Sequence, residues 1–382
     1  MQGIDSSWIY QIGGIKRMSN TLIIRKRIDR RKNAKSVLCS TLLFALLLCG
    51  CGKASAPQAS AASDPEATER STVYVDSMDT FIELSAFGSQ RDAALQAAKE
   101  EILRLNDLLS IGVESSEISR INREGSGTVS ADTAAMIREA LTLFEETDGA
   151  FDLTVYPLME LWGFVSKEYH VPTDEELAET MLRIGADRVQ LDDETSLVTL
   201  DEGQAIDLGG IAKGFASQRL MDIFRENGVE SAIVSLGGNM QCLGTKPDGS
   251  PWRIGVKDPF NPDFGLSAIV QIVDKAVITS GGYERYFVDE ETGTTYRHII
   301  DPATGYPAES GLSSVSIVTA DGMLGDGLST ALYIMGLEKS AEFWRAHKTE
   351  FDAILIDNDG NVYVTAGLEG AVTSEHTITF LR

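Results

Sequence analysis

The sequence predicts an α+β fold, in which a single mixed α/β globular domain follows an N-terminal signal and a flexible tether. Three observations support it. The chain has 382 residues, 43% of them hydrophobic and 24% charged, which is an ordinary globular composition. Expected strands and helices form one mixed succession from residue 72 onward. Neither an internal repeat nor a second linker interrupts that succession, so we expect one domain over residues 72–382.

The sequence of the first part of this domain, residues 71–149, predicts two strands and two helices. Residues 71–88 are β-rich and indicate two strands. Residues 91–110 place apolar side chains at helical spacing and predict a long amphipathic helix. A second helix is expected over residues 130–149, with Ser130 or Asp132 as its N-cap.

The second part is dominated by strands. An amphipathic helix is expected to begin near Ile211. Further β-rich segments occupy residues 231–244, 252–258, 267–281, 283–301 and 312–322. Residues 323–336 and 340–348 return to a helical pattern, and residues 352–365 predict a last hairpin.

Residues 1–50 predict a secretory signal rather than a part of the fold. A basic stretch at residues 25–36 precedes an apolar run at residues 37–49. That run is shorter than the roughly 20 residues that a spanning helix needs. We therefore expect cleavage, and a permanent transmembrane anchor is the alternative. Residues 51–71 begin with Cys51 and are rich in Ala, Ser and Pro, which predicts a flexible tether.

The stretch LCGC, which ends at Cys51, resembles the lipobox of bacterial lipoproteins. The resemblance implies that the thiol of Cys51 is acylated and that Cys51 becomes the first residue of the mature chain. It also implies that a lipid anchor holds the domain to the cell membrane, on its extracytoplasmic side.

Charge narrows the class of ligand that this domain can bind. The full chain has 33 basic and 57 acidic residues, and residues 1–50 hold nine and two of them. The remainder therefore carries 24 basic and 55 acidic side chains, a net charge of −31. Such a surface repels nucleic acid, so we expect no nucleic-acid partner. An anionic ligand would need local backbone N–H groups, a lysine or a bound cation.

The stretch DLGGIAKGFA, residues 207–216, supplies such local groups. Two glycines allow close backbone approach or a positive φ, and the start of a helix near Ile211 presents N–H groups that favour an anion. Lys213 lies within the first turn. The alternative is that this stretch only begins a helix after a strand. Neither the Walker pattern nor GxGxxG is present.

Two further groups of residues indicate chemistry. Asp326 and Thr330 are four residues apart in an expected helix, so they share one face and offer hard oxygen ligands suited to Mg²⁺. We expect this metal site to lie near the surface, although either residue could instead serve as a cap. The stretch YRHIIDPATGYP brings His298 and Asp301 to the end of an edge strand, where they could act in proton transfer or be structural.

Taken together, these segments resemble the ApbE-like family of FAD:protein FMN transferases over roughly residues 72–370. The stretches that carry the resemblance are SMDT, SSEISRIN, TDGAFDLTVYPLMELWGF, AIDLGGIAKGFA, VSLGGN, TSGGYERYF, HIIDPATGYP and DGLSTALYIMG. The resemblance implies an exported α+β lipoprotein that binds FAD and requires Mg²⁺. It also implies transfer of FMN from FAD to a Ser or Thr hydroxyl of an acceptor protein, an exported or membrane redox subunit, with release of AMP.

The resemblance also implies roles for individual residues. FAD would be contacted by Met78, Ala150, Phe151, Asp152, Asp207, Lys213 and Ile300. Mg²⁺ would be held by the carbonyl of Gly210 and the side chains of Asp326 and Thr330. His298 is the candidate general base, with Asp301 as its orienter or as the alternative base.

One position departs from the family pattern. Many members carry a tyrosine or an asparagine about four residues before SEISR, whereas this chain has Gly112. A glycine can neither stack on a flavin ring nor donate a side-chain hydrogen bond to it. An alternative function is therefore a lipoprotein that binds or hydrolyses FAD without transferring FMN.

Overall fold

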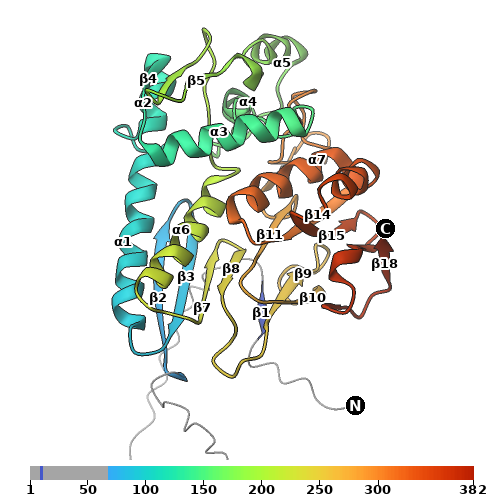
Figure 1. Ribbon diagram of the computed structural model, residues 1–382. Coiled ribbons are helices and arrows are strands. Elements are labelled where there is room, and N and C mark those ends of the chain that lie inside the picture. The colour runs from blue at the N-terminus through green and yellow to red at the C-terminus, as the bar shows by residue number, and fades with distance from the viewer. Residues whose placement is uncertain (1–8, 12–67) are drawn as a thin grey trace, which may run out of the picture. The chain divides into compact units, whose positions relative to one another are not determined.

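A nine-stranded sheet forms the centre of the fold (Figure 1). The computed structural model describes residues 9–11 and 68–382, so Cys51 and most of the tether lie outside the described residues. All neighbouring strands of the sheet are antiparallel except β16 and β18. In spatial order the strands are β18 (Ile378–Leu381), β16 (Val362–Thr365), β15 (Phe351–Asp357), β14 (Leu312–Thr319), β11 (Ala276–Gly281), β8 (Asn239–Leu243), β7 (Ala232–Leu236), β3 (Thr80–Phe87) and β2 (Arg70–Ser77).

Both faces of this sheet are covered. In β7, Ala232, Val234 and Leu236 are buried in the core on the helical face. Ile233 alternates with them and is buried in a second core on the opposite face. Strands buried on both faces read as continuous apolar runs, which is why the sequence of this region shows little polar alternation.

Three helices cover the first face: α1 (Arg91–Leu109), α6 (Ala212–Glu226) and α7 (Gly322–His347). Figure 1 shows α1 and α6 side by side over β2, β3 and β7, with α7 over β11, β14 and β15. The two helices expected at residues 323–336 and 340–348 form one element, divided at Gly336 by a φ of 78°.

A four-stranded sheet encloses the second core. Its order is β1 (Ile9–Gln11), β9 (Trp252–Lys257), β10 (Leu266–Ile272) and β17 (Val372–Thr373). Trp252, Ile254 and Val270 of this sheet are buried there together with Met240 and Cys242 of β8.

The remaining elements are two small sheets and several short helices. Two small sheets contain β4 (Ser126–Thr128), β6 (Leu197–Thr199) and β5 (Gln190–Asp192), and β12 (Tyr286–Val288) with β13 (Thr295–Arg297). The helices are α2 (Glu117–Glu124), α3 (Ala131–Glu146), α4 (Tyr156–Leu161) and α5 (Asp174–Met181), with the short η3 (Ala186–Arg188) and η4 (Ala366–Leu368). Within the part of the chain that is described, no helix has the length and apolar character to cross a bilayer.

Candidate active site

The first turns of α6 and α7 cross at two glycines. A Cβ atom on Gly214 would lie 2.1 Å from the carbonyl oxygen of Gly322, and a Cβ atom on Gly322 would lie 2.7 Å from that of Gly214. No other residue type allows this backbone approach. The crossing brings Asp326, one turn along α7, against the start of α6.

Asp326 is buried at this crossing, with 4% of its surface exposed. Its Oδ2 accepts a hydrogen bond of 2.8 Å from the amide of Gly214, and its Oδ1 accepts one of 2.8 Å from Nδ2 of Asn239. Burial raises the pKa of this carboxyl, and the nearby charge of Lys213 opposes the rise. Asp326 is therefore buried, whereas Gly210 and Thr330, the other two residues of the expected metal site, are half-buried.

The stretch that begins at Asp207 forms the start of α6, as expected. Oδ1 of Asp207 accepts a hydrogen bond of 2.9 Å from the amide of Gly209. Nζ of Lys213 donates to the carbonyl of Gly209 at 3.1 Å and lies 4.0 Å from Oδ1 of Asp326. Gly209 and Gly210 do not have a positive φ, so close packing is what requires a small residue here. A Cβ atom on Gly210 would lie 3.1 Å from the ring of Phe151.

The turn of the β2–β3 hairpin lies close to Asp207. Burial raises the pKa of Asp207, the hydrogen bond from Gly209 and the charge of Lys213 oppose the rise, and the charge of Asp79 adds to it. Met78 and Asp79 form a two-residue turn in which both φ angles are positive, 52° and 55°. A methionine in this conformation is uncommon. The amide of Met78 donates to Oδ1 of Asn106 in α1 at 3.1 Å.

His298 directly follows β13 and is held by the backbone of Arg285. Nδ1 of the ring and the amide of His298 each lie 3.1 Å from the carbonyl oxygen of Arg285. A carbonyl only accepts, so Nδ1 carries the proton and Nε2 has a free lone pair. Burial, the charge of Arg285 and the charge of Lys213 lower the pKa of His298 to about 4. The imidazole is thus neutral at pH 7.

Asp301 and Ile300 shape the turn after His298. Oδ1 of Asp301 accepts a hydrogen bond of 2.9 Å from the amide of Ala303, and its amide donates to the carbonyl of Tyr306 at 2.8 Å. Ile300 is buried and bridges to Pro307. The carbonyl of Arg285, and not this carboxylate, is the group bonded to the ring of His298.

Three groups near the crossing, a carboxylate, a hydroxyl and a carbonyl, offer oxygen atoms of the kind that Mg²⁺ binds. Oγ1 of Thr330, on the same face of α7 as Asp326, is 3.2 Å from Oγ of Ser280. The carbonyl of Gly210 accepts no hydrogen bond from the described residues. One carboxylate, one hydroxyl and one unpaired carbonyl suit an ion that keeps waters and binds substrate phosphate. Within residues 9–11 and 68–382, no group of three or more His, Cys, Asp or Glu side chains is arranged so that it could hold a metal ion.

The segment of residues 150–152 borders this crossing. The ring of Phe151 is buried between Gly210 and Gly327, and a Cβ atom on Gly327 would lie 3.6 Å from it. Ala150 packs against the same core. Asp152 turns inward, since its carboxylate accepts from the amide and hydroxyl of Thr154 at 2.7 and 2.6 Å, besides the amide of Ala186. Burial raises its pKa.

A cavity of about 320 Å³ opens beside Asp207. It is lined by Ile111, Ser119, Asn122, Arg123, Tyr156, Glu160 and Ala205. Asn122 holds the irregular segment before Asp207, because its side chain bonds the amide and the carbonyl of Ile206 at 2.7 and 2.8 Å. Gly112 is exposed next to this cavity, and a Cβ atom there would meet only Oγ of Ser110, at 3.6 Å.

The structure places Lys213 4.0 Å from Asp326, and its charge acts on Asp207 and His298. The sequence did not indicate three of the residues that contact the candidate site. Asn239 bonds Asp326, the carbonyl of Arg285 is bonded to the ring of His298, and Oγ of Ser280 lies 3.2 Å from Oγ1 of Thr330. All three lie in the stretches VSLGGN and TSGGYERYF that carried the resemblance, which is the only signal that the sequence offered for them.

Comparison with known proteins agrees with this architecture. The ApbE family model matches residues 78–355. The FAD:protein FMN transferase of Vibrio cholerae is 35% identical over 272 residues, which cover 70% of this chain and 80% of the relative. The FAD:protein FMN transferase of Treponema pallidum is 32% identical over 313 residues, which cover 76% and 85%.

Solved structures show the same fold. The ApbE protein of Thermotoga maritima superposes with a TM-score of 0.74 at 32% identity, covering 79% of this chain and 99% of that one. The flavin transferase ApbE from Vibrio cholerae gives a TM-score of 0.71 at 28% identity, with the same coverage. The fold and the site therefore define a class of mixed α/β proteins whose solved members include a flavin transferase. The chain belongs to the ApbE family.

Proposed function

We propose that this chain is an FAD:protein FMN transferase, which moves FMN from FAD to a Ser or Thr hydroxyl of an acceptor protein with Mg²⁺ and releases AMP. One observation carries the proposal. Lys213, Asp326 and His298 come from three distant parts of the chain and converge at the start of α6, in a chain whose relatives are named for this reaction.

The first task of the site is to hold a pyrophosphate in an acidic protein. Lys213 and Arg285 are both close enough to Asp207 to lower its pKa. The N-terminal turn of α6 adds backbone N–H groups to these two cations, and no side chain caps it at Ile211. The cavity beside Asp207 gives room for one end of the dinucleotide.

The second task is charge neutralisation during transfer. Gly210, Asp326 and Thr330 would hold Mg²⁺, and the bound ion would draw charge from the phosphate oxygens. Asn239 and the amide of Gly214 fix the carboxylate of Asp326 in place. Nζ of Lys213 lies 4.0 Å from Oδ1 of the same carboxylate.

The third task is proton transfer. The acceptor oxygen bonds to the phosphorus of the FMN half while the bond from that phosphorus to the bridging oxygen of AMP breaks. The hydroxyl proton passes to Nε2 of His298, which is free because Nδ1 donates to Arg285. AMP leaves with the bridging oxygen. Asp301 is the alternative base, and its carboxylate has one further oxygen beyond its bond to Ala303.

A second candidate function rests on Gly112. No side chain occupies the open space next to the cavity beside Asp207. Water could then take the place of the acceptor hydroxyl, which would make the chain an FAD-binding or FAD-hydrolysing lipoprotein. This candidate predicts AMP and free FMN without any labelled protein.

We also propose a location and a partner. Lipid on Cys51 would anchor the domain to the cell membrane, facing the extracytoplasmic side, where the acceptor would be an exported or membrane redox subunit. The net charge of −31 after residue 50 makes a nucleic-acid partner unfavourable.

Incubation with FAD and Mg²⁺ tests the proposed function. The acceptor is supplied as solubilised membrane proteins from cells that lack this chain. We expect a protein gaining the mass of FMN together with an equal amount of AMP. AMP and free FMN without a labelled protein would favour hydrolysis. Unchanged FAD would contradict both transfer and hydrolysis.

A further inference from the structure

A row of three hydroxyl groups joins strand β11 to helix α7 beside the candidate metal site. Oγ of Ser280, on β11, lies 2.7 Å from Oγ of Ser329 and 3.2 Å from Oγ1 of Thr330. The hydroxyl of Ser329 donates a hydrogen bond of 2.8 Å to the backbone carbonyl of Asp326. Ser329 is fully buried, whereas Ser280 and Thr330 are half-buried. The row therefore ends on the residue whose carboxylate is the other candidate side-chain ligand.

The direction of each hydrogen bond in this row follows from the carbonyl at its end. A carbonyl only accepts, so the single proton of the Ser329 hydroxyl is used on Asp326. Ser329 can then only accept from Ser280, and the proton of Ser280 is used in turn. Ser280 therefore accepts the proton of Thr330, which leaves both lone pairs of Oγ1 of Thr330 available for a cation.

The acceptor on β11 matters because a threonine in a helix has a second choice. Its hydroxyl can instead bond the backbone carbonyl one turn back, and χ1 divides between two rotamers for that reason. For Thr330 that carbonyl belongs to Asp326, and it already accepts from the hydroxyl of Ser329. Ser280 gives Thr330 an acceptor on the facing strand, and this bond selects the other rotamer.

Packing between β11 and α7 fixes the position of Ser280. Ser280 pairs with Val315 of β14, so the register of the sheet sets its height along the helix. Ile278 lies on the same face of β11, since it is two residues away. A Cβ atom on Gly325 of α7 would lie 3.2 Å from Cδ1 of Ile278, so the strand and the helix are in close contact before Ser280.

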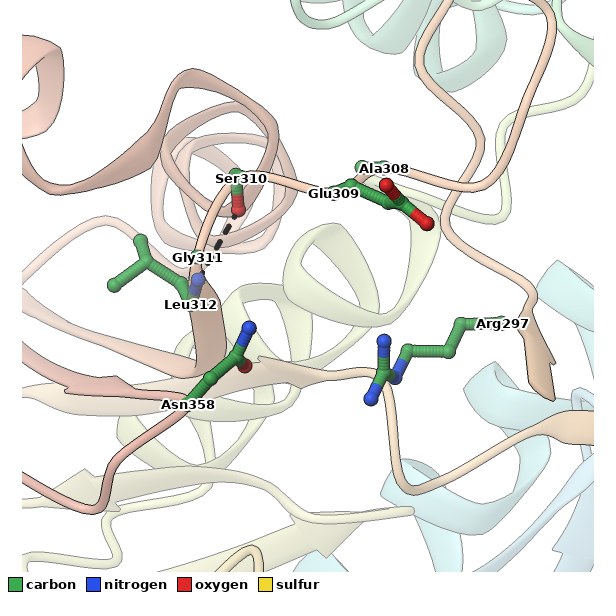
Figure 2. Close-up of a pocket in the computed structure, with 7 residues that line it drawn as sticks. All are labelled: Arg297, Ala308, Glu309, Ser310, Gly311, Leu312 and Asn358. Carbon is green, nitrogen blue, oxygen red and sulfur yellow. Dashed lines mark hydrogen bonds between the residues drawn. The ribbon is translucent and has the colours of Figure 1, made fainter. Parts of the chain in front are cut away.

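The backbone after Ser280 is also tightly packed. A Cβ atom on Gly282 would lie 2.2 Å from Cδ of Arg297 and 2.6 Å from the hydroxyl of Tyr333 on α7. Figure 2 shows the guanidinium of Arg297 directed into a cavity of about 280 Å³, so the aliphatic part of this side chain is what lies against Gly282. Contacts on both sides of Ser280 therefore hold its hydroxyl opposite Thr330.

We infer that Ser280 is a positioning residue for the metal site, which holds the hydroxyl of Thr330 in the orientation that binds Mg²⁺. The inference rests on the proposed function, because that function includes Mg²⁺ at Gly210, Asp326 and Thr330. Ser280 acts through Thr330 and needs no contact with the ion. Groups that orient a metal ligand in this way typically contribute about 10-fold to 100-fold to metal affinity.

Calorimetric titration of the full chain with Mg²⁺, with and without saturating FAD, tests this inference. Ser280→Ala removes the acceptor of Thr330, so we expect the dissociation constant for Mg²⁺ to rise about 10-fold to 100-fold. Ser280→Thr keeps a hydroxyl and should restore most of the affinity. In assays of FMN transfer, a higher Mg²⁺ concentration should restore the maximal rate of Ser280→Ala, because the ligands themselves are still present.

Thr279→Val is the matched control. Oγ1 of Thr279 lies 2.7 Å from Oγ of Ser316, so this variant also removes a pair of bonded hydroxyls from β11, but on the opposite face of the strand. Its affinity for Mg²⁺ should stay within about 2-fold of the wild type. Thermal melts without metal show how much stability each variant loses, so a general loss of stability is distinguished from a loss of metal binding.

A double-mutant cycle shows whether Ser280 acts through Thr330. Thr330→Val removes the hydroxyl that Ser280 is inferred to orient. Ser280→Ala should therefore weaken Mg²⁺ binding in the wild type but cause no further loss in Thr330→Val. An equal loss in both backgrounds would overturn the inference, because Ser280 would then affect the metal by another route.

The outcomes separate this inference from the proposed function. Unchanged Mg²⁺ affinity in Ser280→Ala, beside a wild type that binds Mg²⁺ and transfers FMN, would overturn the inference alone. Mg²⁺ binding that depends on Ser280 but is not accompanied by FMN transfer would support the inference and contradict the proposed function. A wild type that binds no Mg²⁺, even with FAD, would overturn both.

Discussion

The carboxylate of Asp326 accepts a hydrogen bond of 2.8 Å from the amide of Gly214, and this bond joins the first turns of α7 and α6. The contact exists because Gly214 and Gly322 let the two backbones touch. Asp326 is thus a cap for α6 and a candidate metal ligand at once. The sequence left open whether Asp326 is a metal ligand or a cap, and the structure is compatible with both roles.

Replacing Asp326 should separate these two roles. Asp326→Asn keeps the shape and one acceptor, so we expect Mg²⁺-dependent FMN transfer to be lost while the melting temperature without metal changes little. Asp326→Ala leaves the Gly214 amide unpaired, which should cost about 1–3 kcal/mol of unfolding free energy. Calorimetric titration with Mg²⁺ and thermal melts measure both effects.

Asp321→Asn is the matched control for this pair, because Asp321 caps α7 by accepting from the amides of Met323 and Leu324 but is exposed. It should leave Mg²⁺ binding intact. Full transfer activity in Asp326→Asn would show that the metal is held elsewhere.

Lys213 should contribute to nucleotide binding through its charge. A charged hydrogen bond is worth about 1.5–3 kcal/mol, so Lys213→Ala should raise the dissociation constant for FAD roughly 10-fold to 150-fold. The exposed Lys339→Ala on α7 should not change it. Quenching of flavin fluorescence measures the affinity. Equal affinity in Lys213→Ala and wild type would mean that residues 207–216 only begin a helix.

The sequence predicted α6 and its lysine because the glycines and the amphipathic pattern are local signals. Strands β3, β14 and β15 were equally local, since each is rich in apolar residues and lies next to a turn. The segment of residues 156–205 was not assigned, because α4, α5, β5 and β6 are short and depend on tertiary packing. Gly336 divides α7 without ending it, which no local rule anticipates.

The hydrogen-bond partners of the site residues could not be predicted from short sequence patterns, and the reason is different. Asn239 meets Asp326 across 87 residues, and the ring of His298 is held by a backbone carbonyl of Arg285. Backbone carbonyls carry no sequence signature. The sequence instead favoured Asp301 as the orienter of His298, because it is the nearest carboxylate in the chain.

His298 should titrate far below a free histidine. Its pKa of about 4, against 6.5 for the free side chain, means that the folded state remains neutral while the unfolded state binds a proton. The contribution of His298 to stability should thus be full above about pH 6.5 and decline as the pH falls toward 4. NMR of the ring protons measures the pKa, and denaturant melts across this range measure the stability.

His298→Asn should flatten this part of the stability profile and abolish transfer, whereas His170→Asn, at an exposed histidine, should do neither. A ring that titrates near 6.5 in the folded chain would contradict the neutral imidazole on which the proton-transfer step depends.

Cys51 should determine where the chain is found. If its thiol carries lipid, Cys51→Ala should move the protein from the membrane fraction to the soluble fraction or stop its processing. Mass spectrometry of the native N-terminal peptide checks the modification directly. A native chain without lipid in the soluble fraction would refute the proposed anchor.

The most direct measurement of the proposed function is made in the cells that produce this chain. Covalently bound flavin survives denaturing electrophoresis and fluoresces in the gel, so labelled acceptors can be seen without knowing their identity. We predict fluorescent bands in wild-type cells that disappear when the gene is deleted, return with the wild-type chain and do not return with Asp326→Asn. The same bands in the deletion strain would contradict the account.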